Sequence, residues 1–176
     1  GNCVPAIVGL PSSCDEDDLK ALSAAGSSSG NVPLFHAIGI TPEAATLEIA
    51  FQGRQPQQVI EVSVADLQQA RNELGNNSDQ ALDGIALGTP HFSYTEFERL
   101  VSLLDGRSIH PGLVFYLTTS RHVYQLAQSH GWVESLQQAG IKIITDTCTY
   151  FSPVVNGLQG KIMTNSAKWA YYAPGM

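Results

Sequence analysis

The sequence predicts an α/β fold, with a mainly parallel sheet flanked by helices on both faces, in a single domain over residues 1–176. Short apolar runs alternate with segments whose apolar residues recur at helical spacing, which is typical of parallel sheets. The chain is 43% hydrophobic and only 14% charged, with 16 glycines, as in buried strands joined by tight turns. One continuous sheet is expected. A boundary between two subdomains at residues 75–78 is the alternative.

The predicted strands are short apolar runs bounded by turn residues. They are residues 4–10, 32–40, 59–62, 82–87, 113–117, 141–144 and 161–163.

Helices are predicted between the strands from their start signals. Ser13 and Ser93 each have a glutamate three residues later, the pattern of a capping box. Thr41 followed by Pro42 indicates another helix start, with threonine as the cap and proline at the first position. The other helices are expected over residues 64–74, from Ser120 onward, over residues 133–139 and as a turn over residues 166–172.

Composition excludes several classes of partner. The net charge of −7 has the wrong sign for a surface that binds nucleic acid. No apolar stretch approaches the roughly 20 residues that span a bilayer, and the first residues lack the pattern of a secretory signal. Three cysteines are too few and of the wrong parity for a disulfide framework. We therefore expect a cytoplasmic protein with reduced thiols and no membrane or nucleic-acid partner.

Polar side chains follow four of the predicted strands. Because the carboxyl ends of parallel strands meet at one edge of a sheet, we expect these segments to converge there. Helix N-termini at that edge offer N–H groups to a small carboxylate or phosphate. Helix capping alone is the alternative for Ser93 and Ser120, and it explains Arg121, Cys148 and Lys168 less well. The polar segments are residues 88–93, 118–121, 145–148 and 164–168.

Two side chains in these segments have reactive groups. His91 is a candidate general acid or base, and a histidine that only hydrogen-bonds in a loop is the alternative. Asp146 and Cys148 lie two residues apart, so in an extended chain they share one face. A thiolate there is a candidate iron ligand, and an inert buried thiol is the alternative. The sequence contains no C-x-x-C pair, so no local motif holds a complete cluster.

Several segments, taken together and in order, resemble the large, catalytic subunit of aconitase X. The likeness runs from near the first residue to Ala173-Pro174-Gly175. The segments are VPAIVGL from Val4, LFH from Leu34, GITPEA from Gly39, GTPHFS from Gly88, TTSR from Thr118, TDTC from Thr145 and MTNSAK from Met163.

The resemblance implies an iron–sulfur-dependent hydro-lyase, or dehydratase, of the aconitase superfamily. Family members act on cis-3-hydroxy-L-proline or on mevalonate 5-phosphate, and the first is the favoured substrate here. By position in the family motifs, Cys148 is the expected metal-binding residue. Ser166, Lys168 and His91 are the expected catalytic residues. The expected substrate-binding residues are Thr119, Arg121, Asn165 and Ser93.

The family's large subunit is much longer than 176 residues and works with a small swivelling domain. The resemblance therefore implies that this chain is one piece, with the other cluster cysteines and partner domains outside it. We expect the cluster in the full-length enzyme, and neither a bound cluster nor dehydratase activity in this piece alone. Two other functions stay open: a small-anion-binding or regulatory α/β module without catalysis, and an interaction domain without a ligand.

Overall fold

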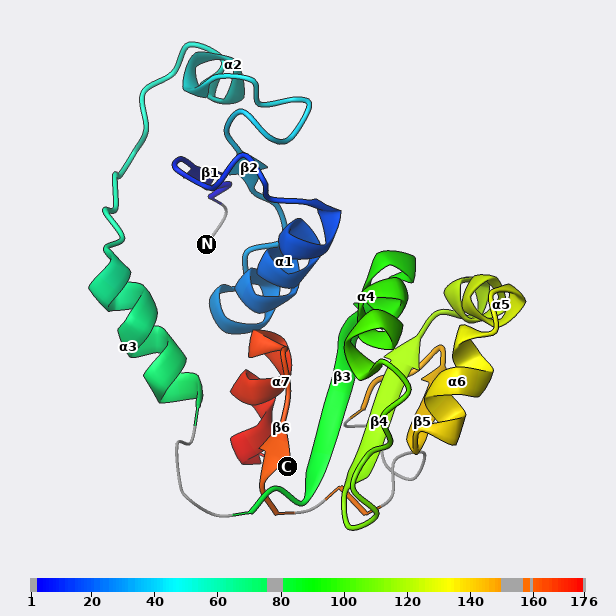
Figure 1. Cartoon of the computed structure of the whole chain (residues 1–176). Coiled ribbons are helices and arrows are strands. Elements are labelled where there is room, and N and C mark those ends of the chain that lie inside the picture. The colour runs from blue at the N-terminus through cyan, green and yellow to red at the C-terminus, as the bar shows by residue number, and fades with distance from the viewer. Residues whose placement is uncertain (1–2, 76–80, 150–156, 159, 176) are drawn as a thin grey trace. The chain divides into compact units, whose positions relative to one another are not determined.

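The chain divides into two compact units, Gly1–Asn77 and Ser78–Met176. The computed structural model (Figure 1) describes residues 3–75, 81–149, 157–158 and 160–175. The division falls at the alternative boundary, residues 75–78. The prediction of one continuous sheet is wrong, because the described residues form two sheets, one of two strands and one of four. Within these ranges, no helix combines the length and apolar character needed to cross a membrane.

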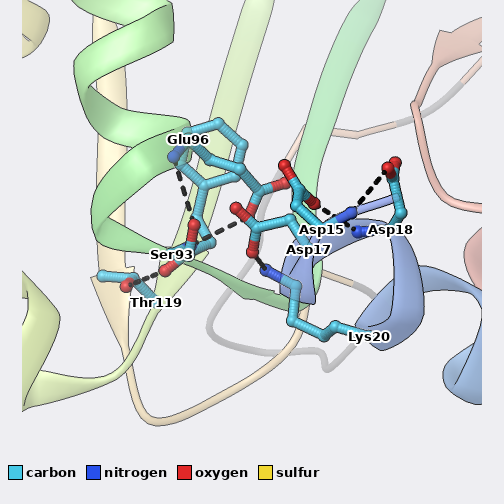
Figure 2. Close-up of polar contacts among 8 residues, drawn as sticks. Asp15, Asp17, Asp18, Lys20, Ser93, Glu96 and Thr119 are labelled. Atoms are coloured by element: carbon cyan, nitrogen blue, oxygen red, sulfur yellow. Dashed lines mark hydrogen bonds and ion pairs between the residues drawn. The ribbon is translucent and has the colours of Figure 1, made fainter. Parts of the chain in front are cut away.

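The first unit contains a minimal parallel sheet, in which β1 (Ala6–Ile7) pairs with β2 (His36–Ala37). Between them lies α1 (Glu16–Gly30), which begins at Asp15 and not at the predicted Ser13. Asp15 and Asp18 form the capping box, each carboxylate accepting the other's backbone N–H (Figure 2). Ser13 lies instead in a turn that the Cys14 N–H closes onto the Pro11 carbonyl, and the helix is capped two residues later.

The helix predicted at Thr41 is also wrong. The Thr41 hydroxyl bonds the backbone of Ala37 instead, which holds these residues in a turn. The next helix, α2 (Leu47–Phe51), starts five residues later at its cap, Thr46.

Residues 59–62 do not form the predicted strand, because no described strand pairs with them. The helix predicted over residues 64–74 is confirmed as α3 (Val64–Leu74).

The second unit has the predicted α/β architecture, a parallel sheet flanked by helices. Its strands lie in the order β5-β4-β3-β6, and every neighbouring pair is parallel. The elements are β3 (Gly84–Phe92), α4 (Tyr94–Leu104), β4 (Val114–Thr119), α5 (Arg121–Ser129), α6 (Trp132–Gln138), β5 (Ile141–Thr145), β6 (Ile162–Met163), α7 (Ala167–Tyr172) and the 3₁₀ turn η1 (Ala173–Gly175).

An apolar core joins this sheet to its helices. Leu117 at the centre of β4 is fully buried, as are Phe97 of α4 and Leu136 of α6. Phe97 also meets Phe92, at the end of β3, edge to face at 5.5 Å. Burying a side chain of this size stabilises a fold by roughly 1.5–3 kcal/mol. The core therefore fixes α4 and α6 against the sheet and orients the carboxyl ends of its strands.

The strand order contains one reversal of winding. The chain runs from β3 to β4 to β5 in one direction and then returns to place β6 on the other side of β3. In open α/β sheets the ligand crevice lies outside the carboxyl ends of the strands where the winding reverses. The topology therefore points to the carboxyl ends of β3 and β6.

At its carboxyl end, β3 runs very close to β4. The strand continues past the predicted end at residue 87 to Phe92, with an irregular register between Leu87 and Phe92. Gly88 has φ +90°, and a Cβ there would overlap the Thr118 carbonyl. The buried Thr118 and Thr119 hydroxyls donate across the gap to the carbonyls of Gly88 and Phe92, at 2.6 and 2.7 Å. Glycine is thus required at position 88.

We predict that Gly88→Ala destabilises the chain by about 3 kcal/mol or more, because β3 and β4 must move apart. Gly106→Ala is the matched control: Gly106 has φ +73° but no atom near the added Cβ, so backbone strain alone costs about 1–2 kcal/mol. Urea unfolding of both variants measures the difference. Equal losses would show that the close approach at Gly88 is unimportant.

Candidate functional site

The chain turns off β5 at Asp146 and crosses towards the carboxyl end of β3. Asp146 has a left-handed backbone, with φ 58°, and its N–H donates to the Thr119 carbonyl at 2.8 Å. The expectation that Asp146 and Cys148 share one face of an extended chain is therefore wrong, because β5 ends at Thr145. Residues 146–149, called the crossing loop below, form a turn and not a continuation of the strand.

The Asp146 carboxylate fixes the start of the crossing loop. One oxygen accepts the Arg121 backbone N–H at 2.9 Å, and the other lies 2.8 Å from the Arg121 guanidinium. The bond from the Arg121 N–H lowers the pKa of Asp146 below its ordinary value, with a smaller effect from the Arg121 charge. The sequence motifs pointed to Arg121 but not to its partner. That partner is Asp146, 25 residues later, whose carboxylate makes both contacts. Arg121 is thus paired with a carboxylate within the protein.

Two contacts with β3 fix the other end of the crossing loop. His91 Nε2 lies 2.8 Å from the Thr147 carbonyl; a carbonyl can only accept, so this nitrogen carries the proton. The buried hydroxyls of Thr89 and Thr149 lie 3.2 Å apart. Cys148 lies between these two anchored residues and is half-buried. The crossing loop therefore holds the thiol beside the carboxyl end of β3.

The predicted residues that follow β6 lie on the other neighbour of β3. Ser166 is buried, and its hydroxyl caps α7 by accepting the Trp169 N–H at 2.9 Å. Lys168 is half-buried in the first turn of α7, a helix that contacts β3, and Asn165 is exposed. Among the described residues, the buried Trp169 indole N–H has no acceptor. A group from outside these residues would stabilise it, since an unmade buried bond costs about 1–3 kcal/mol.

Ser93 and Thr119 bond to the main chain. Ser93 caps α4 in the predicted box with Glu96: its hydroxyl accepts the Glu96 N–H at 3.1 Å, and the Glu96 carboxylate accepts the Ser93 N–H at 2.8 Å (Figure 2). The fully buried Thr119 hydroxyl donates to the Phe92 carbonyl. Both contacts organise the edge of the sheet. The predicted role of these two residues in substrate binding remains a prediction.

The carboxyl edge thus brings several predicted residues to β3 and its neighbours. His91 lies on β3, Cys148 is in the crossing loop above it, and Ser166 and Lys168 follow β6. Arg121 lies further along, at the end of β4. It also lines a shallow hollow beside α5 and β5 that contains none of the other predicted residues. The carboxyl end of β3, where the winding reverses, is therefore a better candidate site than this hollow.

This edge of the sheet contains one residue suited to bind a metal cluster, Cys148. Iron–sulfur clusters are held mainly by cysteine thiolates, and Cys148 fits one such position. The described residues contain no group of three or more histidine, cysteine or acidic side chains able to hold a metal ion. The remaining ligands of a cluster would have to come from elsewhere.

Comparisons with known proteins agree with this division into two units. The family model for the aconitase X second domain matches residues 1–72, and the model for the third domain matches residues 82–176. The chain belongs to the aconitase X family. The resemblance inferred from the sequence motifs is thereby confirmed.

The aconitase X relatives are much longer than this chain. It is 43% identical over 176 residues to a cis-3-hydroxy-L-proline dehydratase of Pseudomonas aeruginosa, covering 98% of the chain but 30% of that protein. It is 37% identical to a phosphomevalonate dehydratase large subunit of Methanothermobacter thermautotrophicus, covering 91% of the chain and 38% of the relative. The crystal structure of Thermococcus kodakaraensis aconitase X in its holo-form matches with a TM-score of 0.82 at 32% identity, over 99% of this chain and 43% of that one.

The Asp146–Arg121 contact predicts a dependence of stability on pH. Because the folded-state pKa of Asp146 is lowered, its contribution is fully present above the ordinary aspartate pKa of about 3.9 and is lost as pH falls through the folded value. Asp146→Asn should therefore lower the urea midpoint of unfolding at pH 6–7. In acid, the midpoints of the variant and the unchanged protein should become equal. A deficit of equal size at every pH would contradict an ionic role.

Proposed function

We propose that this chain is part of an iron–sulfur-dependent hydro-lyase that dehydrates a small hydroxy carboxylate, with cis-3-hydroxy-L-proline as the substrate. The observation that carries the proposal is the crossing loop, which holds Cys148 beside β3 where the winding reverses. Ser166 and Lys168 follow the adjacent strand β6. The dehydratase names of the relatives support the reaction type, and the Pseudomonas relative supports the substrate.

In this proposal the chain contributes binding and proton transfer. The Lys168 ammonium attracts the substrate carboxylate, and Asn165 and Arg121 hold further oxygens. His91 and Ser166 hold or move a proton, because imidazole and hydroxyl groups are suited to general acid–base steps. The cluster, when bound in the full-length enzyme, supplies Lewis-acid chemistry for the leaving hydroxyl. Cys148 is its proposed ligand from this chain.

We further propose that these residues work within a longer protein. The chain spans 30% and 38% of the two dehydratases described above, so the remaining domains, or a small swivelling subunit, would complete the site. The cytoplasm is the proposed location, because Cys148 must stay reduced to bind iron. All three cysteines are free thiols in the structure.

The role of Cys148 can be tested by iron content. In the full-length protein, Cys148→Ser should abolish stoichiometric iron–sulfur binding after anaerobic reconstitution, because a hydroxyl replaces the thiolate ligand. Circular dichroism should show that the fold survives. Cys14→Ser is the control and should retain iron, since Cys14 lies outside the segments that resemble the family motifs. Full iron content in Cys148→Ser would show that the thiol is not a ligand.

The role of Lys168 can be tested by kinetics. Lys168→Met should lower kcat/KM for cis-3-hydroxy-L-proline by about 10–100-fold in the full-length enzyme, the loss expected for one hydrogen bond to a charged group. Lys142→Met removes the same charge from an exposed position on β5 and should have little effect. Equal effects of the two substitutions would exclude a specific contact with the substrate.

A further inference from the structure

The carboxyl edge of the second unit contains buried threonine hydroxyls of two kinds. The Thr118 and Thr119 hydroxyls each donate to a main-chain carbonyl of β3. Thr89 of β3 and Thr149 of the crossing loop are 4% and 2% exposed, and their hydroxyl oxygens lie 3.2 Å apart. We call Thr89 and Thr149 the hydroxyl pair. Within the described part of the chain, neither of these two hydroxyls makes another hydrogen bond.

The hydroxyl pair contains one more donor than its own contact can use. Each threonine hydroxyl carries a single proton, and only one proton can lie between two oxygens. Whichever hydroxyl donates to the other, the second O–H is left without an acceptor among the described residues. A donor buried without an acceptor destabilises a fold, so nearly all such groups in native proteins have a partner. The hydroxyl pair therefore indicates an acceptor that another group supplies.

The position of the hydroxyl pair favours a sulfur atom as that acceptor. Thr149 follows Cys148 in the chain, and its contact with Thr89 is one of the two that hold the crossing loop on β3. Cluster sulfides and ligating thiolates accept hydrogen bonds, and such bonds help to set the reduction potential of a cluster. A cluster bound through Cys148 would bring sulfur atoms to the neighbouring residues of the loop, where one O–H lacks an acceptor.

We propose that the hydroxyl pair donates a hydrogen bond to a sulfur of the cluster bound at Cys148 and thereby stabilises that cluster. This depends on the proposed function, because Cys148 must be a ligand. Neither threonine coordinates iron, so both are positioning residues that act through the sulfur. Outer partners of this kind commonly change metal affinity by about 10–100-fold when they are removed.

The unpaired donor can be tested in the cluster-free full-length protein. The double variant Thr89→Val with Thr149→Val removes both hydroxyls and keeps the side-chain shapes, so its Tm should equal or exceed that of the unchanged protein. Thr118→Val is the matched control. It removes a buried hydroxyl that donates to the Gly88 carbonyl, and it should lower Tm by about 2 °C or more. Equal losses in the two proteins would overturn the proposal.

Iron release and redox titration test the acceptor. After anaerobic reconstitution of the full-length protein, the double variant should release iron to ferrozine about 10-fold faster than the unchanged protein. Its reduction potential should fall, because a hydrogen bond to sulfur favours the more negative, reduced cluster. Thr118→Val should change neither quantity. Unchanged iron release and potential in the double variant would overturn the proposal in favour of a buried water as the acceptor.

Cys148→Ser separates this inference from the proposed function. If Cys148→Ser loses its iron but the double variant behaves as the unchanged protein, the ligand is correct and only the role of the hydroxyl pair is overturned. Full iron content in Cys148→Ser would overturn both. Loss of iron from Cys148→Ser, together with faster iron release from the double variant, supports both.

Discussion

The carboxylate of Asp146 is the constraint on which the candidate site depends. Its left-handed backbone turns the chain off β5, and its two oxygens hold the backbone and the guanidinium of Arg121 at the start of α5. Only because the chain turns there can the crossing loop reach β3, where His91 and Thr89 hold it on either side of Cys148. The Asp146 turn at one end of the loop and the His91 and Thr89 contacts at the other together hold the residues on either side of Cys148.

The sheet beneath supplies a rigid base for this loop. Gly88 lets β3 approach the backbone of β4, and two buried threonine hydroxyls donate across the gap. On the other side of the reversal of winding, β6 pairs with Gly84 and Ile85 at the start of β3, and α7, which follows β6, contacts β3. The crossing loop, β3 and α7 thus have a thiol, an imidazole and an ammonium group on adjoining elements of this unit.

The helices and caps that depend only on residues close together in the chain could be predicted from the sequence. Residues 64–74 were recognisable as a helix, and Ser93 as a cap, because these signals act over three or four residues. The sequence did not show which of two nearby residues would cap a helix. Asp15 caps α1 in place of Ser13, and the Thr41 hydroxyl donates to the Ala37 carbonyl instead of capping a helix. Strand pairing depends on distant partners, so the separation into two sheets and the missing strand at residues 59–62 escaped prediction. Within the candidate site, the polar segments were predictable as N-caps and strand ends, whereas the pairing of Asp146 with Arg121 required the left-handed turn to be known.

Locating the iron in the full-length protein tests the central claim most directly. Anomalous diffraction at the iron edge, from anaerobically prepared crystals, would place each metal atom relative to the crossing loop. An iron atom is expected at bonding distance from Cys148 Sγ, beside the carboxyl end of β3. A fully occupied cluster ligated only by other cysteines, with Cys148 remote from every iron atom, would contradict this expectation.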